Sequence, residues 1–154
     1  MIIQLDSSNQ QLIELSEECF SELRTIYYPN KLAKAQKGAL NNNWVSFGYF
    51  VSDKLVACVD VKLSDKALSL SSLSVNKKYR RQGIARKLVY GVIDKFENVD
   101  IASLWCVKQT GNVLLFESLN FNVIQEVRSE LFNLTKGGCA IEVQLTLCCN
   151  KPFY

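Results

Sequence analysis

The chain has 154 residues, of which 48% are hydrophobic and 21% charged, and its formal net charge is +3. This length supplies the core of one ordinary domain and is short for two. The mild charge does not by itself indicate nucleic-acid or membrane binding. No apolar run approaches the ~20 residues of a membrane span, and the opening MIIQLDSSNQQ lacks the features of a secretory signal. We therefore expect a single domain over residues 1–154 that works in the cytoplasm and has no membrane partner.

The hydrophobic pattern predicts, in chain order, a strand, two helices, three strands, a helix, a strand, a helix and two strands. The expected ranges are 2–5, 10–28, 31–40, 44–51, 55–63, 67–75, 84–97, 101–107, 112–119, 122–134 and 139–149. Ser7 or Ser8 is the expected cap of the first helix, and Pro29 closes it. These elements predict an α/β domain in which a meander precedes a right-handed strand-helix-strand unit with parallel strands.

One strand carries an irregularity in its pattern. Apolar residues alternate along 67–75, but the alternation slips in phase between Leu70 and Leu73. A slip of this kind indicates a β-bulge, which we expect near Ser71–Ser72.

The segment YRRQGIARKLV, residues 79–89, places a glycine where a loop enters a helix. A helix N-terminus offers free backbone N–H groups and the positive end of the helix dipole. Gly83 lacks a side chain, so an anion can approach the backbone closely. The nucleotide-binding patterns G-x-x-x-x-G-K-[ST] and G-x-G-x-x-G are both absent. The segment predicts a phosphate site of another kind, with a solvated basic surface as the alternative.

The residue types present limit the chemistry. The chain contains no histidine, which excludes Ser-His-Asp and Cys-His mechanisms. A general acid or base must be a carboxylate, a tyrosine, a cysteine, a lysine, an amine terminus or water. The six cysteines include no C-x-x-C pair, so we expect no metal site.

Two motifs resemble those of the general N-acetyltransferase (GNAT) superfamily. LSVNKKYRRQGIARKL, residues 73–88, is similar to its acetyl-coenzyme A loop, [Q/R]-x-x-G-x-[G/A], here Arg80, Gly83 and Ala85. About thirty residues on, QTGNVLLFESLNF, residues 109–121, is similar to the family segment N-x-x-A-x-x-x-Y-x-x-x-G-F. The order of elements also matches over nearly the whole chain.

The resemblance implies a mixed, largely antiparallel sheet of about seven strands with about four helices. It implies an acetyl-CoA cleft between the splayed parallel strands 67–75 and 101–107. Backbone N–H groups of residues 81–86 would cradle the pyrophosphate, and residues 73–75 would pair with the pantetheine arm. The cofactor-binding residues that the resemblance implies are Leu73, Ser74, Val75, Arg80, Arg81, Gln82, Gly83, Ile84, Ala85, Arg86, Gln109 and Phe116.

The chain departs from the family where protons are transferred. Phe116 stands at the position where many relatives have a tyrosine whose hydroxyl protonates the leaving thiolate. The usual glutamate base has no counterpart in 67–75. Gln109, Asn112 and Asn120 also replace the usual Asn, Ala and Gly, although asparagine tolerates the left-handed backbone that glycine adopts. The catalytic residues therefore stay unassigned.

The function that the resemblance implies is acetyl-CoA-dependent N-acetylation of a primary amine, on a small molecule or a protein, by direct attack on the thioester. A catalytically weak or inactive acyl-CoA-binding module of the same fold is the alternative. A third hypothesis, nucleic-acid binding, would use Lys77, Lys78, Arg80 and Arg81. We expect no nucleic-acid partner, and either a monomer or a homodimer.

Overall fold

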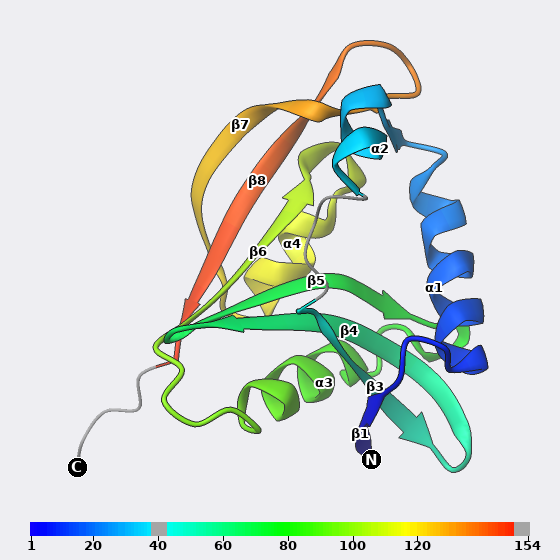
Figure 1. Ribbon diagram of the computed structural model, residues 1–154, viewed down its shortest axis with the longest axis vertical. Coiled ribbons are helices and arrows are strands. Elements are labelled where there is room, and N and C mark those ends of the chain that lie inside the picture. Colours follow the sequence, from blue (N-terminus) through cyan, green and yellow to red (C-terminus); the bar gives the residue numbers. More distant parts are fainter. Residues whose placement is uncertain (38–42, 150–154) are drawn as a thin grey trace. The chain divides into compact units, whose positions relative to one another are not determined.

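The structure, a computed structural model, describes residues 1–37 and 43–149. It contains a sheet of 8 strands in the order β1-β3-β4-β5-β6-β8-β7-β2 (Figure 1). The strands are β1 (Ile2–Leu5), β2 (Tyr27–Pro29), β3 (Val45–Val51), β4 (Lys54–Ser64), β5 (Ala67–Val75), β6 (Ile101–Val107), β7 (Asn122–Leu134) and β8 (Cys139–Cys148). The α-helices are α1 (Gln10–Leu23), α2 (Lys31–Lys37), α3 (Ile84–Ile93) and α4 (Asn112–Ser118), and 3₁₀ turns form at η1 (Lys77–Tyr79) and η2 (Lys108–Thr110).

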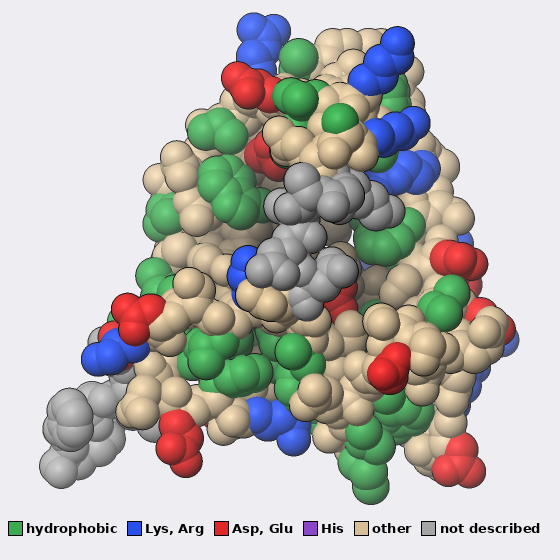
Figure 2. Space-filling view, viewed as in Figure 1, with side chains coloured by type: hydrophobic (Ala, Val, Ile, Leu, Met, Phe, Trp, Pro, Cys, Tyr) green, Lys and Arg blue, Asp and Glu red, His purple; other side chains and the backbone are tan. Residues whose placement is uncertain are grey.

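The predicted class is confirmed. Antiparallel pairing joins β1 with β3, β3 with β4, β4 with β5, β7 with β8 and β2 with β7. None of the described helices is long and apolar enough to cross a membrane. The face seen in Figure 2 carries side chains of both charge signs with hydrophobic side chains among them, as the small net charge leads one to expect.

The described residues form two compact units. Unit 1 contains β1, the first part of α1, β3 to β5 and α3. Unit 2 contains α2, β2, α4, β7 and most of β8. Strand β6 passes from unit 1 into unit 2 after Ser103. A single domain over residues 1–154 stays a prediction.

In unit 1 both faces of β4 are covered. On one face, α3 lies against β3, β4 and β5, and its helical apolar stripe is buried (Figure 1). That stripe consists of Ile84, Leu88, Val89, Val92 and Ile93. On the other face, the buried residues of α1 pack on Leu55 and Cys58. The helix α3 that follows the exposed loop is therefore anchored by its buried stripe against the sheet of unit 1.

In unit 2 the long strands β7 and β8 form a hairpin. Beyond it, the short strand β2 pairs with the end of β7, where Tyr27 meets the ring of Phe132 edge-on at 5.3 Å between centroids. The sequence pattern missed β2 because three residues show no period and their partners lie about a hundred positions away. This strand accounts for the eighth member of the sheet.

The boundaries of the first helix differ from the prediction. The first helix ends at Leu23 rather than near 28, because the chain turns over residues 24–26 and the aromatic residues Tyr27 and Tyr28 enter β2. Its cap is Asn9, whose side chain accepts a hydrogen bond from the Leu12 amide at 3.1 Å, and neither Ser7 nor Ser8 takes that role. The helix expected over 31–40 is seen to Lys37, and its remainder lies outside the described residues.

The helix expected over 84–97 ends at Ile93. The chain then turns, with the Phe96 amide bonded to the Ile93 carbonyl at 3.1 Å. The Phe96 ring still reaches the core, edge-on to Phe47 at 6.1 Å. Phe96 therefore continues the four-residue apolar spacing beyond the end of the helix, which is why the sequence pattern predicted a longer helix.

Candidate functional site

The loop between β5 and α3 has a defined path. The Asn76 amide donates to the Val56 carbonyl at 2.8 Å, and its side chain accepts from the Lys78 amide at 3.0 Å to cap η1. Two residues then adopt left-handed backbone, Arg81 with φ 62° and Gly83 with φ 77°. A left-handed arginine is uncommon, since its Cβ crowds the following carbonyl oxygen. The loop is therefore built around a strained turn that leads directly into α3.

The N-terminus of α3 is open. Gly83 is its N-cap and supplies no side-chain hydrogen bond. The first ladder bond runs from the Lys87 amide to the Gly83 carbonyl at 3.1 Å, so the amides of Ile84 and Ala85 precede the helical ladder. A Cβ built at Gly83 meets nothing within 4 Å. These donors, with the helix dipole behind them and open space before them, suit an anion.

The polar side chains around this opening make different contacts. Arg80 is tied to the preceding strand, because its Nε donates to the Val75 carbonyl at 2.9 Å. Gln82 donates through Nε2 to the Lys78 carbonyl at 3.3 Å. Arg81 and Arg86 are exposed, and the Arg86 guanidinium lies 5.7 Å from the centroid of the Tyr90 ring. Positive charge therefore surrounds the opening, and part of it is held by hydrogen bonds to the backbone.

Strand β5 carries the predicted bulge. Cys58 pairs with Ser74 and Asp60 with Ser71, so two residues of β5 oppose one residue of β4. Ser72, one of those two, has a left-handed φ of 57°. The residues after the bulge form the segment expected along pantetheine: Leu73 and Val75 are half-buried and Ser74 is buried. The Val75 carbonyl already accepts from Arg80 and, at 3.8 Å, from the Cys19 thiol.

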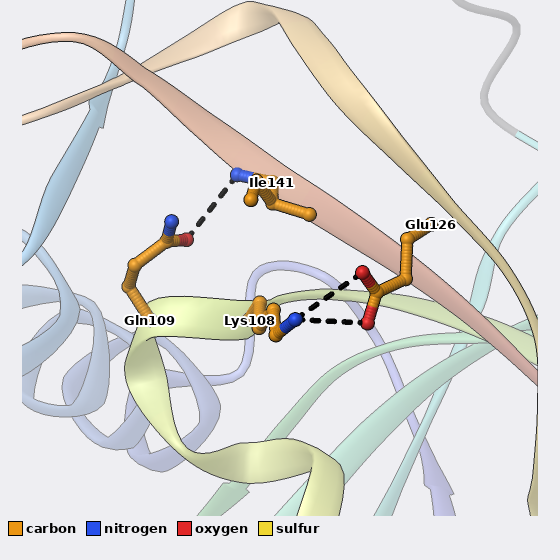
Figure 3. A network of polar contacts seen from close by, with 4 residues as sticks. All are labelled: Lys108, Gln109, Glu126 and Ile141. Carbon is orange, nitrogen blue, oxygen red and sulfur yellow. Dashed lines mark hydrogen bonds and ion pairs between the residues drawn. The ribbon is translucent and has the colours of Figure 1, made fainter.

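The second motif lies in unit 2, where its side chains make contacts of their own. Gln109 accepts through Oε1 from the Ile141 amide at 3.2 Å, beside an ion pair of 3.1 Å between Lys108 and Glu126 (Figure 3). Phe116 is buried, edge-on to Phe121 at 6.1 Å. A cofactor role for Gln109 and Phe116 stays a prediction.

Asn120 stands at the usual glycine position of that motif. Its φ is 74°, within the left-handed region. Asparagine therefore adopts here a left-handed backbone that glycine also tolerates, as the sequence led us to expect.

The described residues contain no group of three or more His, Cys, Asp or Glu side chains that could hold a metal ion. Cys106 is a poor nucleophile, because burial raises the pKa of its thiol to about 11 and keeps it protonated near neutral pH.

One carboxylate on the strand next to β5 was missed from the sequence. Asp60 is half-buried on β4, where the Ser46 hydroxyl donates to it at 2.6 Å. The sequence feature that could have identified Asp60 as a candidate site residue is that it is a single acidic residue inside the apolar strand LVACVDVKL.

Comparison with known proteins agrees with this geometry. The model of the acetyltransferase (GNAT) family matches residues 9–121. The [ribosomal protein bS18]-alanine N-acetyltransferase of Haemophilus ducreyi is 28% identical over 130 residues, which cover 79% of this chain and 88% of that protein.

Solved structures share the fold. The ribosomal-protein-S18-alanine N-acetyltransferase of Escherichia coli superposes with a TM-score of 0.74 at 19% identity, covering 99% of this chain and 96% of that one. A GNAT acetyltransferase of Elizabethkingia anophelis with acetyl-CoA bound superposes with a TM-score of 0.68 at 15% identity, covering 96% and 97%. The chain belongs to the acetyltransferase (GNAT) family and is an N-acetyltransferase.

Proposed function

We propose that this chain, acting as one domain, transfers the acetyl group of acetyl-coenzyme A to the α-amine at the N-terminus of a protein. The observation that supports acetyl-coenzyme A as the cosubstrate is the open helix N-terminus at Gly83, with its left-handed backbone and free space beyond it. The observation that favours the acceptor is the similarity to enzymes named for N-acetylation of an alanine on a ribosomal protein.

The loop fits a pyrophosphate. Two negative phosphates match the amides of Ile84 and Ala85, which precede the helical ladder, the positive end of the α3 dipole and the exposed guanidinium of Arg81. In this arrangement Arg80 shapes the loop through Val75, and its contribution to the ligand is charge rather than a fork of hydrogen bonds. Residues 73–75 would hold the pantetheine arm through backbone groups other than the occupied Val75 carbonyl.

Bound acetyl-coenzyme A supplies an activated thioester. The acceptor amine forms a C–N bond to the thioester carbonyl carbon and its nitrogen loses a proton, while the C–S bond breaks and the thiolate takes a proton. The chain's contribution is to position the two reactants and to direct backbone N–H groups at the carbonyl oxygen. Phenylalanine at 116 cannot donate a proton, so the thiolate takes its proton from water or another group.

An acetyl-transfer assay tests this function. We expect the protein to release free coenzyme A from acetyl-coenzyme A when a peptide beginning with alanine is present, and the peptide to gain one acetyl group at its α-amine. The control is the same peptide with its N-terminus already formylated, which should remain unchanged. Transfer only to lysine side chains would refute the proposed acceptor. Binding of acetyl-coenzyme A without transfer to any amine would identify an acyl-CoA-binding module instead.

A further inference from the structure

Asp60 interrupts an otherwise apolar strand. Its neighbours Val59 and Val61 are buried, and along the strand they alternate with Cys58, which packs on the α1 side of β4. Asp60 points to the opposite face, because successive side chains of a strand alternate. Its partner on β3 is Ser46 and its partner on β5 is Ser71. Three polar side chains therefore lie in a row across three adjacent strands of unit 1.

The apolar cover of that face stops next to Asp60. Two residues earlier, Cys58 is only 2% exposed and belongs to the cluster that packs against α1. The Ser16 hydroxyl of α1 lies 3.9 Å from the Cys58 thiol. Asp60 itself is half-buried. The carboxylate thus stands at the edge of the core, desolvated in part and still reachable.

Asp60 lacks the partner that a structural carboxylate normally has. A carboxylate inside a sheet is usually paired with a cation. Within residues 1–37 and 43–149, Asp60 forms no ion pair, and its polar contact is the hydrogen bond from Ser46 at 2.6 Å. Burial raises the pKa of the Asp60 carboxyl, and the Ser46 hydrogen bond offsets part of that rise. A carboxylate held in this way is a stronger base than one in water.

Few ionisable groups share this face. Among the described residues they include Cys58 and Lys62 from β4 and Cys19 from α1, while β3 and β5 present serines beside Asp60. Burial raises the pKa of the Cys58 thiol to about 11, and the charge of Asp60 adds to that rise, so the thiol is neutral when the carboxyl titrates. Lys62, half-buried two residues along the strand, is a cation on the same face.

The position of Asp60 along the sheet connects it to the proposed cosubstrate site. Asp60 pairs with Ser71, the last paired residue before the bulge, and residues 73–75 follow directly. Those are the residues assigned above to the pantetheine arm. The pyrophosphate would lie at the loop after residue 75, so the pantetheine arm would run from there toward residue 73 and place the thioester beyond it. The Asp60 carboxylate lies at that far end of the segment.

We propose that Asp60 is the catalytic base, which accepts the proton that the acceptor ammonium must lose before or during attack. The nitrogen keeps the electron pair of the broken N–H bond and uses it to form the C–N bond. The carboxylate becomes a carboxylic acid and returns its proton to solvent after the product leaves. This role rests on the acetyl transfer proposed above and supplies the base that strand 67–75 lacks.

Asp60→Asn tests the proposal with acetyl-coenzyme A and a peptide beginning with alanine. Asparagine keeps the size of the side chain and removes the base, so we expect kcat/KM near neutral pH to fall by about 100-fold or more. The deficit should shrink as pH rises above the α-amine pKa of about 8, because the peptide amine then arrives unprotonated. The affinity for acetyl-coenzyme A should stay within about twofold.

Two further variants complete the test. Asp65→Asn is the matched control, since Asp65 is exposed in the turn between β4 and β5 and its left-handed φ of 56° suits asparagine; its activity should be unchanged. Ser46→Ala removes the hydrogen bond that lowers the Asp60 pKa. A base works only when deprotonated, so the acid-side loss of kcat/KM that the Asp60 carboxyl sets should move to higher pH in Ser46→Ala. In Asp60→Asn that loss should instead follow the pKa of the peptide α-amine, about 8.

The outcomes are distinct. An Asp60→Asn protein as active as the parent, or one impaired equally at every pH, overturns the proposal. If Asp60→Asn fails to fold, an unshifted pH profile in Ser46→Ala overturns it. A parent protein that acetylates no amine would instead contradict the proposed function and leave no transfer for Asp60 to assist.

Discussion

We expect Gly83→Glu to weaken acetyl-coenzyme A binding by about 100-fold or more. A glutamate at the N-cap of α3 would occupy the open space in front of the helix amides and place a carboxylate where the pyrophosphate is expected. Like charges in contact across a binding surface cost several kcal/mol, and about 1.4 kcal/mol corresponds to tenfold in affinity. Isothermal titration calorimetry with acetyl-coenzyme A measures this loss directly.

Backbone strain must be separated from charge in that experiment. Gly83 has a φ of 77°, so any side chain with a Cβ is strained there. Gly138→Glu is the matched control, because Gly138 has a φ of 87° with nothing within 4 Å of a built Cβ, and the new side chain is the same. Gly83→Asn adds a neutral side chain that tolerates this backbone, and it should lose less affinity than Gly83→Glu. An equal loss in Gly138→Glu and Gly83→Glu would refute the phosphate site at Gly83.

Leu88→Ala should lower the free energy of unfolding by about 2–5 kcal/mol. Leu88 is fully buried in the apolar stripe of α3 that packs on the sheet of unit 1. Truncation leaves a cavity in a layer where few neighbours can move to fill it. At about 3 kcal/mol, the melting temperature should drop by roughly 6–12 °C for a chain of this size. Thermal unfolding followed by circular dichroism checks this.

The same substitution at Leu114 provides the comparison for Leu88→Ala. Leu114 lies in α4 and is 75% exposed, so Leu114→Ala should change stability by no more than about 0.5 kcal/mol. Similar losses in the two variants would show that burial in α3 is not what stabilises unit 1.

The features that the sequence could predict are local ones. The start of α3 directly after Gly83 follows from a lone glycine between a basic loop and a four-residue apolar period. The bulge at Ser72 follows from the slip in alternation between Leu70 and Leu73. In each case the residues that determine the geometry are within a few positions of each other.

The features that the sequence could not predict depend on distant partners. Gln109 resembles a motif residue, yet its carbonyl oxygen is bonded to the amide of Ile141, 32 positions away. Asp60 reads as one polar residue in a buried strand, and its environment depends on the pairing with Ser46 and Ser71. No local pattern contains that information.

The central claim is that the loop around Gly83 binds acetyl-coenzyme A in the folded protein, and thermal unfolding of the unsubstituted chain during titration with this ligand tests it most directly. A ligand that binds only the folded state adds about 2.7 kcal/mol at about 100 times its dissociation constant. For a chain of this size, that corresponds to a rise in melting temperature of roughly 5–11 °C. We predict such a rise with acetyl-coenzyme A and its absence in Gly83→Glu. An unchanged melting temperature of the unsubstituted chain at millimolar acetyl-coenzyme A would contradict the account.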